Sequence, residues 1–102
     1  MHFKRQIRNI LLIGALFCAC SPALYLPTME DASHTGVSTD SLMMGRTLYV
    51  KHCGSCHNLH LPQQFTSSHW QEEIPYMKRK AKITDQEAQL ITKFVLARSK
   101  AE

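Results

Sequence analysis

Five consecutive residues near the middle of the chain, Cys53-Gly54-Ser55-Cys56-His57, constrain what it can fold into more than any other feature. The two thiols are three positions apart, so on one turn of helix each can bond a vinyl group of the same porphyrin. The imidazole that follows can then bind the iron as its proximal ligand. The spacing Cys-x-x-Cys-His is typical of c-type haem attachment. The motif therefore predicts one covalently bound haem c.

Two other uses of a Cys-x-x-Cys pair stay open at this point. A thioredoxin-like dithiol needs a strand that leads into the motif, whereas the flanking segments here have helical patterns. A zinc half-site needs a second pair of ligands at metal spacing. No further cysteine lies downstream of Cys56, although His52 and His60 offer imidazoles. The haem interpretation accounts best for the motif together with its context.

Residues 1–20 are predicted to be an export signal. Three cations and no acid precede an apolar run over residues 10–17, which is too short to span a bilayer comfortably. The end of this segment resembles a bacterial lipobox, with small Ala19 before Cys20, so Cys20 is predicted to carry a lipid. Cleavage after Ala19 or Ala23 without lipid, or an uncleaved anchor, are the alternatives. The predicted location is the periplasmic side of a bacterial membrane.

The charge balance changes once the signal is removed. The whole chain carries a formal net charge of +4, but without residues 1–20 nine Lys and Arg face eight Asp and Glu. A global basic surface for nucleic acid is therefore not expected. The sequence also shows no plausible arrangement of nucleophile and base, so we expect no enzyme activity of its own and no small-molecule substrate.

Residues 21–40 show no sustained period of two or 3.6, and are predicted to be a flexible tether. As a flexible coil they would hold the domain about 25 Å from its lipid. Docking of Tyr25 and Leu26 on the domain is the alternative. Residues 41–102 form the predicted domain, which is small enough to need a cofactor or another staple for stability.

Three helical segments are predicted in this domain. The first begins near Asp40 or Ser41 and ends near residue 52. The last begins at Thr84, where Glu87 completes the pattern of a capping box. The middle helix is predicted to start at Ser67 or Ser68 and to place Trp70, Ile74 and Met77 on one face. It is predicted to bend or end near Pro75. Because no strand-like alternation of useful length occurs, the predicted fold is all-α.

With the haem motif, the pattern Gly45-x-x-x-Tyr49 resembles the N-terminal helix of small monohaem class I cytochromes c. The likeness covers roughly residues 41 to 99. It implies about three helices around a covalently attached haem, with the N-terminal and C-terminal helices crossing. Gly45, which has no Cβ, would let the helices approach closely, and Tyr49 would pack against an aromatic residue such as Phe94.

The same resemblance suggests the second iron ligand. Members of the class typically use a methionine between the haem motif and the last helix, which is the position of Met77. The alternatives are that His69 is the second ligand, or that the iron has no second protein ligand. Pro62 is a candidate to accept the Nδ1 proton of the proximal His57 through its carbonyl. Trp70 is expected to pack against the porphyrin or to donate its N–H to a propionate.

These features predict electron transfer by one haem that cycles between Fe(III) and Fe(II), with His57 proximal and Met77 distal. The expected partners are redox proteins or a membrane oxidoreductase complex. A basic run over residues 78–82 could steer an acidic partner to the haem, or could be a solvated face. The alternative functions are a haem-based sensor that binds a small gas and a haem subunit of a larger complex.

Overall fold

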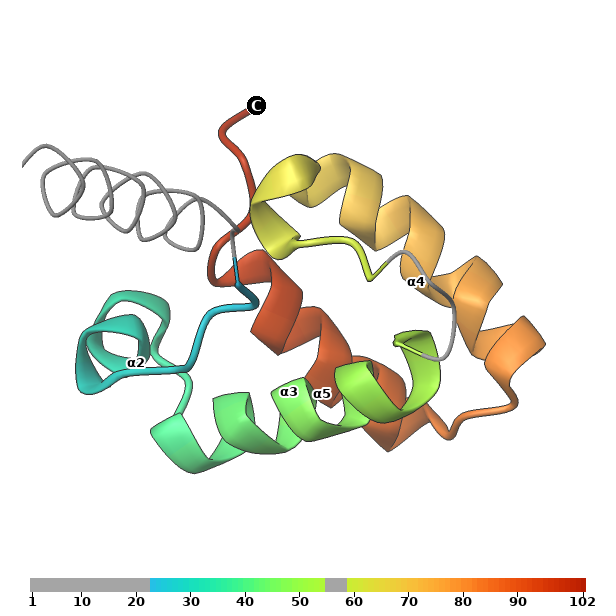
Figure 1. Ribbon diagram of the computed structural model, residues 1–102, viewed down its shortest axis with the longest axis horizontal. Helices are drawn as coiled ribbons and strands as arrows, with labels where there is room; N and C mark the ends of the chain where they lie inside the picture. The colour runs from blue at the N-terminus through green and yellow to red at the C-terminus, as the bar shows by residue number, and fades with distance from the viewer. Residues whose placement is uncertain (1–22, 55–58) are drawn as a thin grey trace, which may run out of the picture.

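The computed structural model describes residues 23–54 and 59–102. The described chain is helical, which confirms the all-α prediction, and no strand occurs in it beyond one isolated bridge between Thr66 and Lys100. No helix in these two stretches is long and apolar enough to cross a membrane. Figure 1 shows the elements in chain order: α2 (Met29–Thr35), α3 (Thr39–Cys53), the short 3-10 helix η1 (Pro62–Gln64), α4 (Ser67–Ala81) and α5 (Asp85–Leu96).

Side-chain caps fix where the predicted helices begin. Helix α5 has the predicted capping box: the Thr84 hydroxyl accepts from the Glu87 N–H at 3.1 Å, and the Glu87 carboxylate accepts from the Thr84 N–H at 3.0 Å. The other two helices begin slightly earlier than predicted, because Ser38 caps α3 and Thr66 caps α4. Each cap satisfies a backbone N–H that has no partner within the helix.

Helix α4 does not end near Pro75, which corrects one of the two outcomes predicted for this segment, a bend or an end. The helix continues to Ala81, with Pro75 inside it and exposed. A proline here removes one backbone hydrogen bond, to the carbonyl of Gln71. Buried Trp70 and Ile74 before the proline, together with the half-buried Ala81 after it, hold both halves of the helix on one core. This packing supplies the free energy that offsets the lost hydrogen bond.

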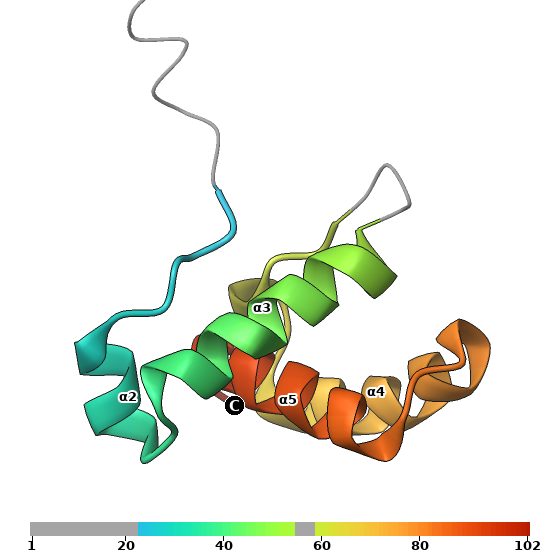
Figure 2. The ribbon, with the colours of Figure 1, turned by 90° about the horizontal axis from the view of Figure 1, so that it is seen from below.

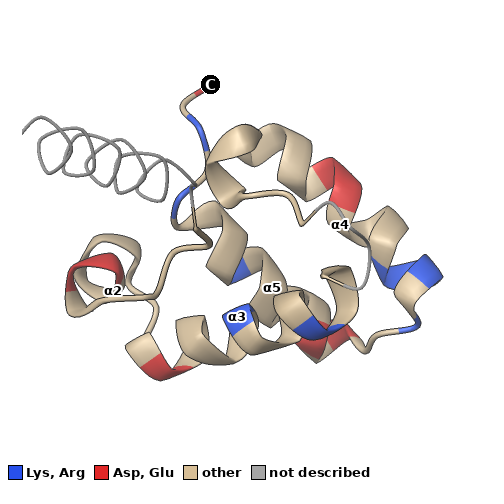
Figure 3. Cartoon of the chain, viewed as in Figure 1, with Lys and Arg blue, Asp and Glu red and all other residues tan. Residues whose placement is uncertain are grey.

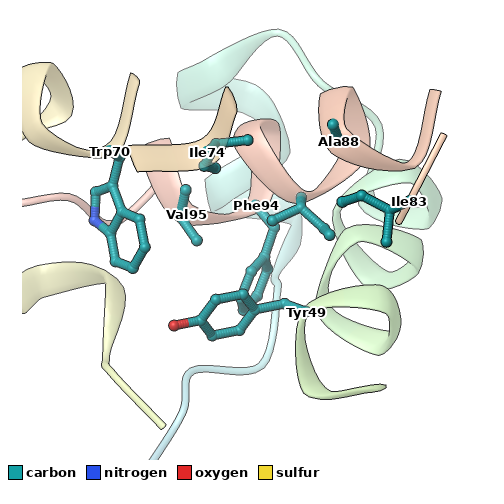
Figure 4. Packing of buried hydrophobic residues seen from close by; sticks show 8 residues of the cluster. Tyr49, Trp70, Ile74, Ile83, Ala88, Phe94 and Val95 are labelled. Atoms are coloured by element: carbon teal, nitrogen blue, oxygen red, sulfur yellow. The ribbon is translucent and has the colours of Figure 1, made fainter. Parts of the chain in front are cut away.

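The core is centred on the crossing of α3 and α5 (Figures 1 and 2). Gly45 makes this crossing possible: a Cβ at this position would lie 2.2 Å from the Leu90 carbonyl oxygen and 2.8 Å from the Phe94 Cβ. Next to the glycine, the Tyr49 ring packs on the fully buried Phe94 with ring centres 5.7 Å apart (Figure 4). The predicted close crossing and the Tyr49–Phe94 contact are both confirmed.

The segment predicted to be a tether is partly ordered, and this corrects the assignment of residues 21–40. Helix α2 starts at a capping box formed by Thr28 and Asp31. The Tyr25 ring stacks on Phe94 with ring centres 4.6 Å apart and an angle of 5° between the rings. Asp31 is buried and accepts two hydrogen bonds from Arg98, at 2.7 and 3.1 Å. We call residues 23–37 the strap.

The strap escaped prediction because its contacts are long-range. The Asp31–Arg98 pair joins residues 67 positions apart, and the Tyr25 hydroxyl donates to the Phe94 carbonyl across 69 positions. Neither contact leaves a local period in the sequence. Of the alternative to a free tether, docking of Tyr25 and Leu26, the structure contains the Tyr25 contact, whereas Leu26 is exposed.

Gly45→Ala tests the helix crossing. In an ordinary helix this change would stabilise by about 1 kcal/mol through helix propensity. Here the added methyl group has to push α3 and α5 apart, so we expect the free energy of unfolding to fall by about 1–3 kcal/mol, as for other overpacked cores. Denaturant unfolding of the purified protein measures the change. Thr47→Ala, at an exposed position of the same helix, is the control. A stabilised Gly45→Ala protein would contradict the close crossing.

Asp31→Asn tests the attachment of the strap. Arg98 is the main cause that lowers the pKa of Asp31 from 3.8 to about 2. A lowered carboxyl pKa contributes stability that is complete above about pH 4 and is lost as the pH falls toward 2. We expect the variant to lose about 1–2 kcal/mol at pH 7, the range for charged hydrogen bonds at a partly exposed site.

The pH dependence separates this ion pair from a general effect of substitution. The difference in stability between wild type and Asp31→Asn should shrink as the pH falls from about 4 to about 2. Glu72→Gln, which removes an exposed carboxylate of α4, is the control. A difference that is constant with pH would argue against the pair.

Candidate functional site

Helix α3 ends at the first cysteine of the motif. Cys53 is its last residue, and the Gly54 N–H donates to the Val50 carbonyl at 3.1 Å. The other two haem-binding residues, Cys56 and His57, lie outside the described residues, as does the predicted lipid site Cys20. Their predicted roles therefore stay predictions.

A cavity of about 110 Å³ lies beside Cys53. Its wall contains Met77, so the fold brings the first thiol of the motif and the predicted distal ligand to one place. Helix α3, helix α4 and the segment before α4 all contribute to the wall. The lining residues are Tyr49, Cys53, His60, Phe65, His69, Trp70, Glu73 and Met77.

A second, much smaller cavity of about 10 Å³ continues the apolar side of this site. Cys53 and Met77 belong to both cavities, whereas His60 and His69 line only the larger one. The remaining wall of the small cavity is apolar or aromatic, from Tyr49, Trp70, Ile74, Ala81, Ile83 and Ile91. Met77 therefore lies at the apolar end of the site, and the imidazoles lie at its more polar end.

Burial controls the ionisation of the two titratable groups that α3 contributes. It raises the pKa of the Cys53 thiol to about 11, so the free thiol is neutral at physiological pH. Burial also raises the pKa of the Tyr49 hydroxyl, which donates to the His60 carbonyl. The site thus offers soft sulfur donors and imidazoles in surroundings that disfavour charge.

Trp70 and Pro62, two predicted cofactor-binding residues, contact each other. The indole N–H of Trp70 donates to the Pro62 carbonyl at 2.9 Å, and both residues are buried. An indole has one N–H, so in this structure it is not free for a propionate, and Trp70 contributes to the cavity by packing. A carbonyl oxygen has a second lone pair, so the predicted hydrogen bond from His57 to Pro62 stays a prediction.

Several lining residues escaped the sequence analysis. Phe65 lies between two histidines, with ring centres 5.2 Å from His60 and 4.4 Å from His69. Glu73 lies four residues after His69 and four before Met77, so the helical period of α4 could have indicated it. The sequence analysis gave His60 no role on the far side of the haem; the structure places it in the cavity wall. No local signal identifies Phe65 or His60, because both lie outside regular helix.

A larger hollow elsewhere does not have the chemistry of this site. An open groove of about 600 Å³ runs between α4 and α5, past Pro75 and the ion pair of Lys78 with Asp85. Its described lining contains no cysteine, histidine or methionine. Among residues 23–54 and 59–102, no group of three or more His, Cys, Asp or Glu could hold a metal ion. The Cys53–Met77 cavity is therefore the candidate site.

Comparisons with known proteins do not supply a relative: no family model, curated protein or solved structure matches this chain. A functional assignment has to come from the motif and from the residues gathered around Cys53.

Tyr49→Phe tests how the site is held together. The variant keeps the ring contacts of Tyr49 with Phe94 and Trp70, but it removes the hydrogen bond to the His60 carbonyl. We expect the free energy of unfolding to fall by about 1–2 kcal/mol, as for a lost hydrogen bond that leaves a carbonyl without its partner. Tyr76→Phe, at a half-exposed tyrosine on α4, is the matched control. Equal stabilities of the two variants would contradict a structural role for the Tyr49 hydroxyl.

Proposed function

We propose that this protein is an electron carrier of the class I cytochrome c type, with one haem c bound at the Cys53–Met77 cavity. The observation that carries the proposal is the convergence of two distant residues. Cys53 begins the attachment motif, Met77 follows it by 24 positions, and both line the same apolar cavity. The motif alone predicts a haem, and the shared cavity supports Met77, on another helix, as its second iron ligand.

The chemistry of the site fits a haem. Its walls are mainly aromatic and aliphatic, as a porphyrin requires, and they include the thiol-bearing Cys53 and the thioether-bearing Met77. A porphyrin is larger than the present cavity, so the walls have to separate to admit one. Helices α3 and α4 pack mainly on α5 rather than on each other, which leaves the core crossing intact when they separate.

In this proposal each residue has a defined task. Cys53 and Cys56 would hold the haem through thioether bonds, and His57 and Met77 would be the iron ligands. The haem would supply one-electron chemistry, with each electron received from one redox partner and passed to another. A thioether donor favours the ferrous state and raises the reduction potential. Two fixed protein ligands keep the rearrangement between oxidation states small.

The position of the side chains favours Met77 over His69 as the distal ligand. Met77 lines both cavities and shares the smaller one with Ile83 and Ile91. His69 lines only the larger cavity, where its ring stacks on Phe65 at an angle of 23°. Moving His69 to an iron would cost this stacking contact.

The proposed carrier works at the periplasmic face of a membrane, with Cys20 lipidated and with a redox protein or membrane oxidoreductase complex as its partner. A basic run occupies the last turn of α4, directly after Met77 (Figure 3). Its cations are partly engaged locally: Lys78 pairs with Asp85, and the Lys80 ammonium lies 4.9 Å from the centre of the Tyr76 ring. Arg79 and Lys82 are exposed and can meet an acidic partner.

Met77→Ala tests the proposal. Wild-type protein, purified after export in a host that attaches haem c, should keep its haem under denaturing conditions. Its ferric form should show the far-red absorption band of methionine-bound iron. We expect Met77→Ala to lose this band and to have a lower reduction potential, because the thioether stabilises the ferrous form. Visible and far-red spectra and a redox titration measure both changes.

Two further variants serve as controls. Met44→Ala removes an exposed methionine of α3 and should leave the spectrum and the potential unchanged. His69→Ala should keep the far-red band. Loss of the band in His69→Ala but not in Met77→Ala would assign the iron to His69. Rapid binding of carbon monoxide by the wild type would favour a gas-binding sensor, and a chain without covalent haem would overturn the proposal.

A further inference from the structure

The strap is attached to the domain almost from its first residue. Leu24 and Tyr25 pack against the core, and the Tyr25 carbonyl accepts from Arg46 Nε at 3.0 Å. The Arg98 guanidinium lies 4.7 Å from the centre of the Tyr25 ring while it binds Asp31. The strap is thus held by α3 through Arg46 and by α5 through Phe94, with Arg98 just beyond the end of α5.

This attachment shortens the link between the domain and its predicted lipid. Cys20 lies four residues before Leu24, and an extended chain covers at most about 3.5 Å per residue. The lipid-bearing residue can therefore be no more than about 14 Å from the docked strap, compared with about 25 Å on average for a twenty-residue coil. One face of the domain has to stay close to the membrane.

Two apolar side chains are exposed on that face. Leu26 is 61% exposed and Met29 is 83% exposed, and they lie six and nine residues after Cys20. Single exposed apolar residues are common on protein surfaces and by themselves indicate nothing. Here the partner of these side chains is the lipid layer, because the short link to the lipid brings them to the boundary between headgroups and acyl chains.

We propose that the strap is a fixed mount that holds the domain against the lipid surface, with the Leu26 and Met29 side chains in the interfacial layer. The inference rests on the proposed function in one respect, the lipid on Cys20. With this mount, the domain of the carrier does not move freely on a flexible tether. The Cys53–Met77 cavity is held at a fixed orientation, so its redox partner is bound to the same membrane.

Site-directed spin labelling of the full-length, lipidated, haem-loaded protein tests the mount. The protein is placed in vesicles of phosphatidylethanolamine and phosphatidylglycerol with a nitroxide on Met29→Cys or, as control, on Gln86→Cys. Both positions are exposed, and Figures 1 and 2 show α2 and the start of α5 at opposite ends of the domain. Wild-type protein treated with the label gives the background.

Oxygen concentrates in lipid, whereas a nickel chelate stays in water, so the ratio of their collision rates with a label reports its depth. We expect this ratio to be severalfold higher for the label at position 29 than for the label at position 86. Equal ratios at the two positions would overturn the mount. A doubly labelled protein, at positions 29 and 86, should give a narrow distance distribution by pulsed EPR; a broad one would mean that the strap is detached.

Spectra and masses from the same samples separate the two proposals. A protein with covalent haem and a lipid, but with equal ratios at the two positions, would refute the mount and leave the carrier standing. A protein with a lipid and unequal ratios, but without haem, would refute the carrier alone. Absence of the lipid from Cys20 would overturn the mount whatever the haem content.

Discussion

The close crossing of α3 and α5 at Gly45 is the contact on which the rest of this structure depends. With no side chain at this position, the backbone of α3 approaches the Leu90 carbonyl and the Phe94 Cβ. Phe94 is fully buried as a result, and its ring is then contacted by Tyr49 on one side of the crossing and by Tyr25 from the strap. Separation of the helices would remove the contact between Tyr49 and Phe94.

The candidate site is built outward from this crossing. Tyr49 reaches from α3 to Trp70 on α4 with ring centres 6.1 Å apart (Figure 4). Trp70 packs in turn on Phe65, with ring centres 5.4 Å apart. The Tyr49 hydroxyl and the Trp70 indole hold the carbonyls of His60 and Pro62, so they fix the segment that follows the attachment motif. The packing of aromatic rings therefore connects the stability of the core to the position of Cys53.

The strap extends the same contacts to the N-terminal side of the domain. Its stacked tyrosine and its buried carboxylate both depend on α5 and the residue just after it, through Phe94 and Arg98. In the proposed carrier, one short helix thus supports the core, the wall of the haem site and the mount at the membrane. Contacts of α5 that serve the core, the site and the strap together stabilise a domain that is too small to bury a large core.

The sequence by itself determined the helical class, the start of α5 at Thr84 and the Gly45 crossing, because caps, period and a glycine at a close approach are local signals. It also marked Cys53 and Met77 as residues to consider for one site. Only the tertiary structure decided that these two line one cavity, that α4 continues through Pro75, that Trp70 and Pro62 bind each other, and that the tether docks. Each of these depends on contacts between residues distant in the chain, or on burial that compensates a locally unfavourable residue. Such free energies arise from packing in three dimensions and leave no period or spacing in the sequence.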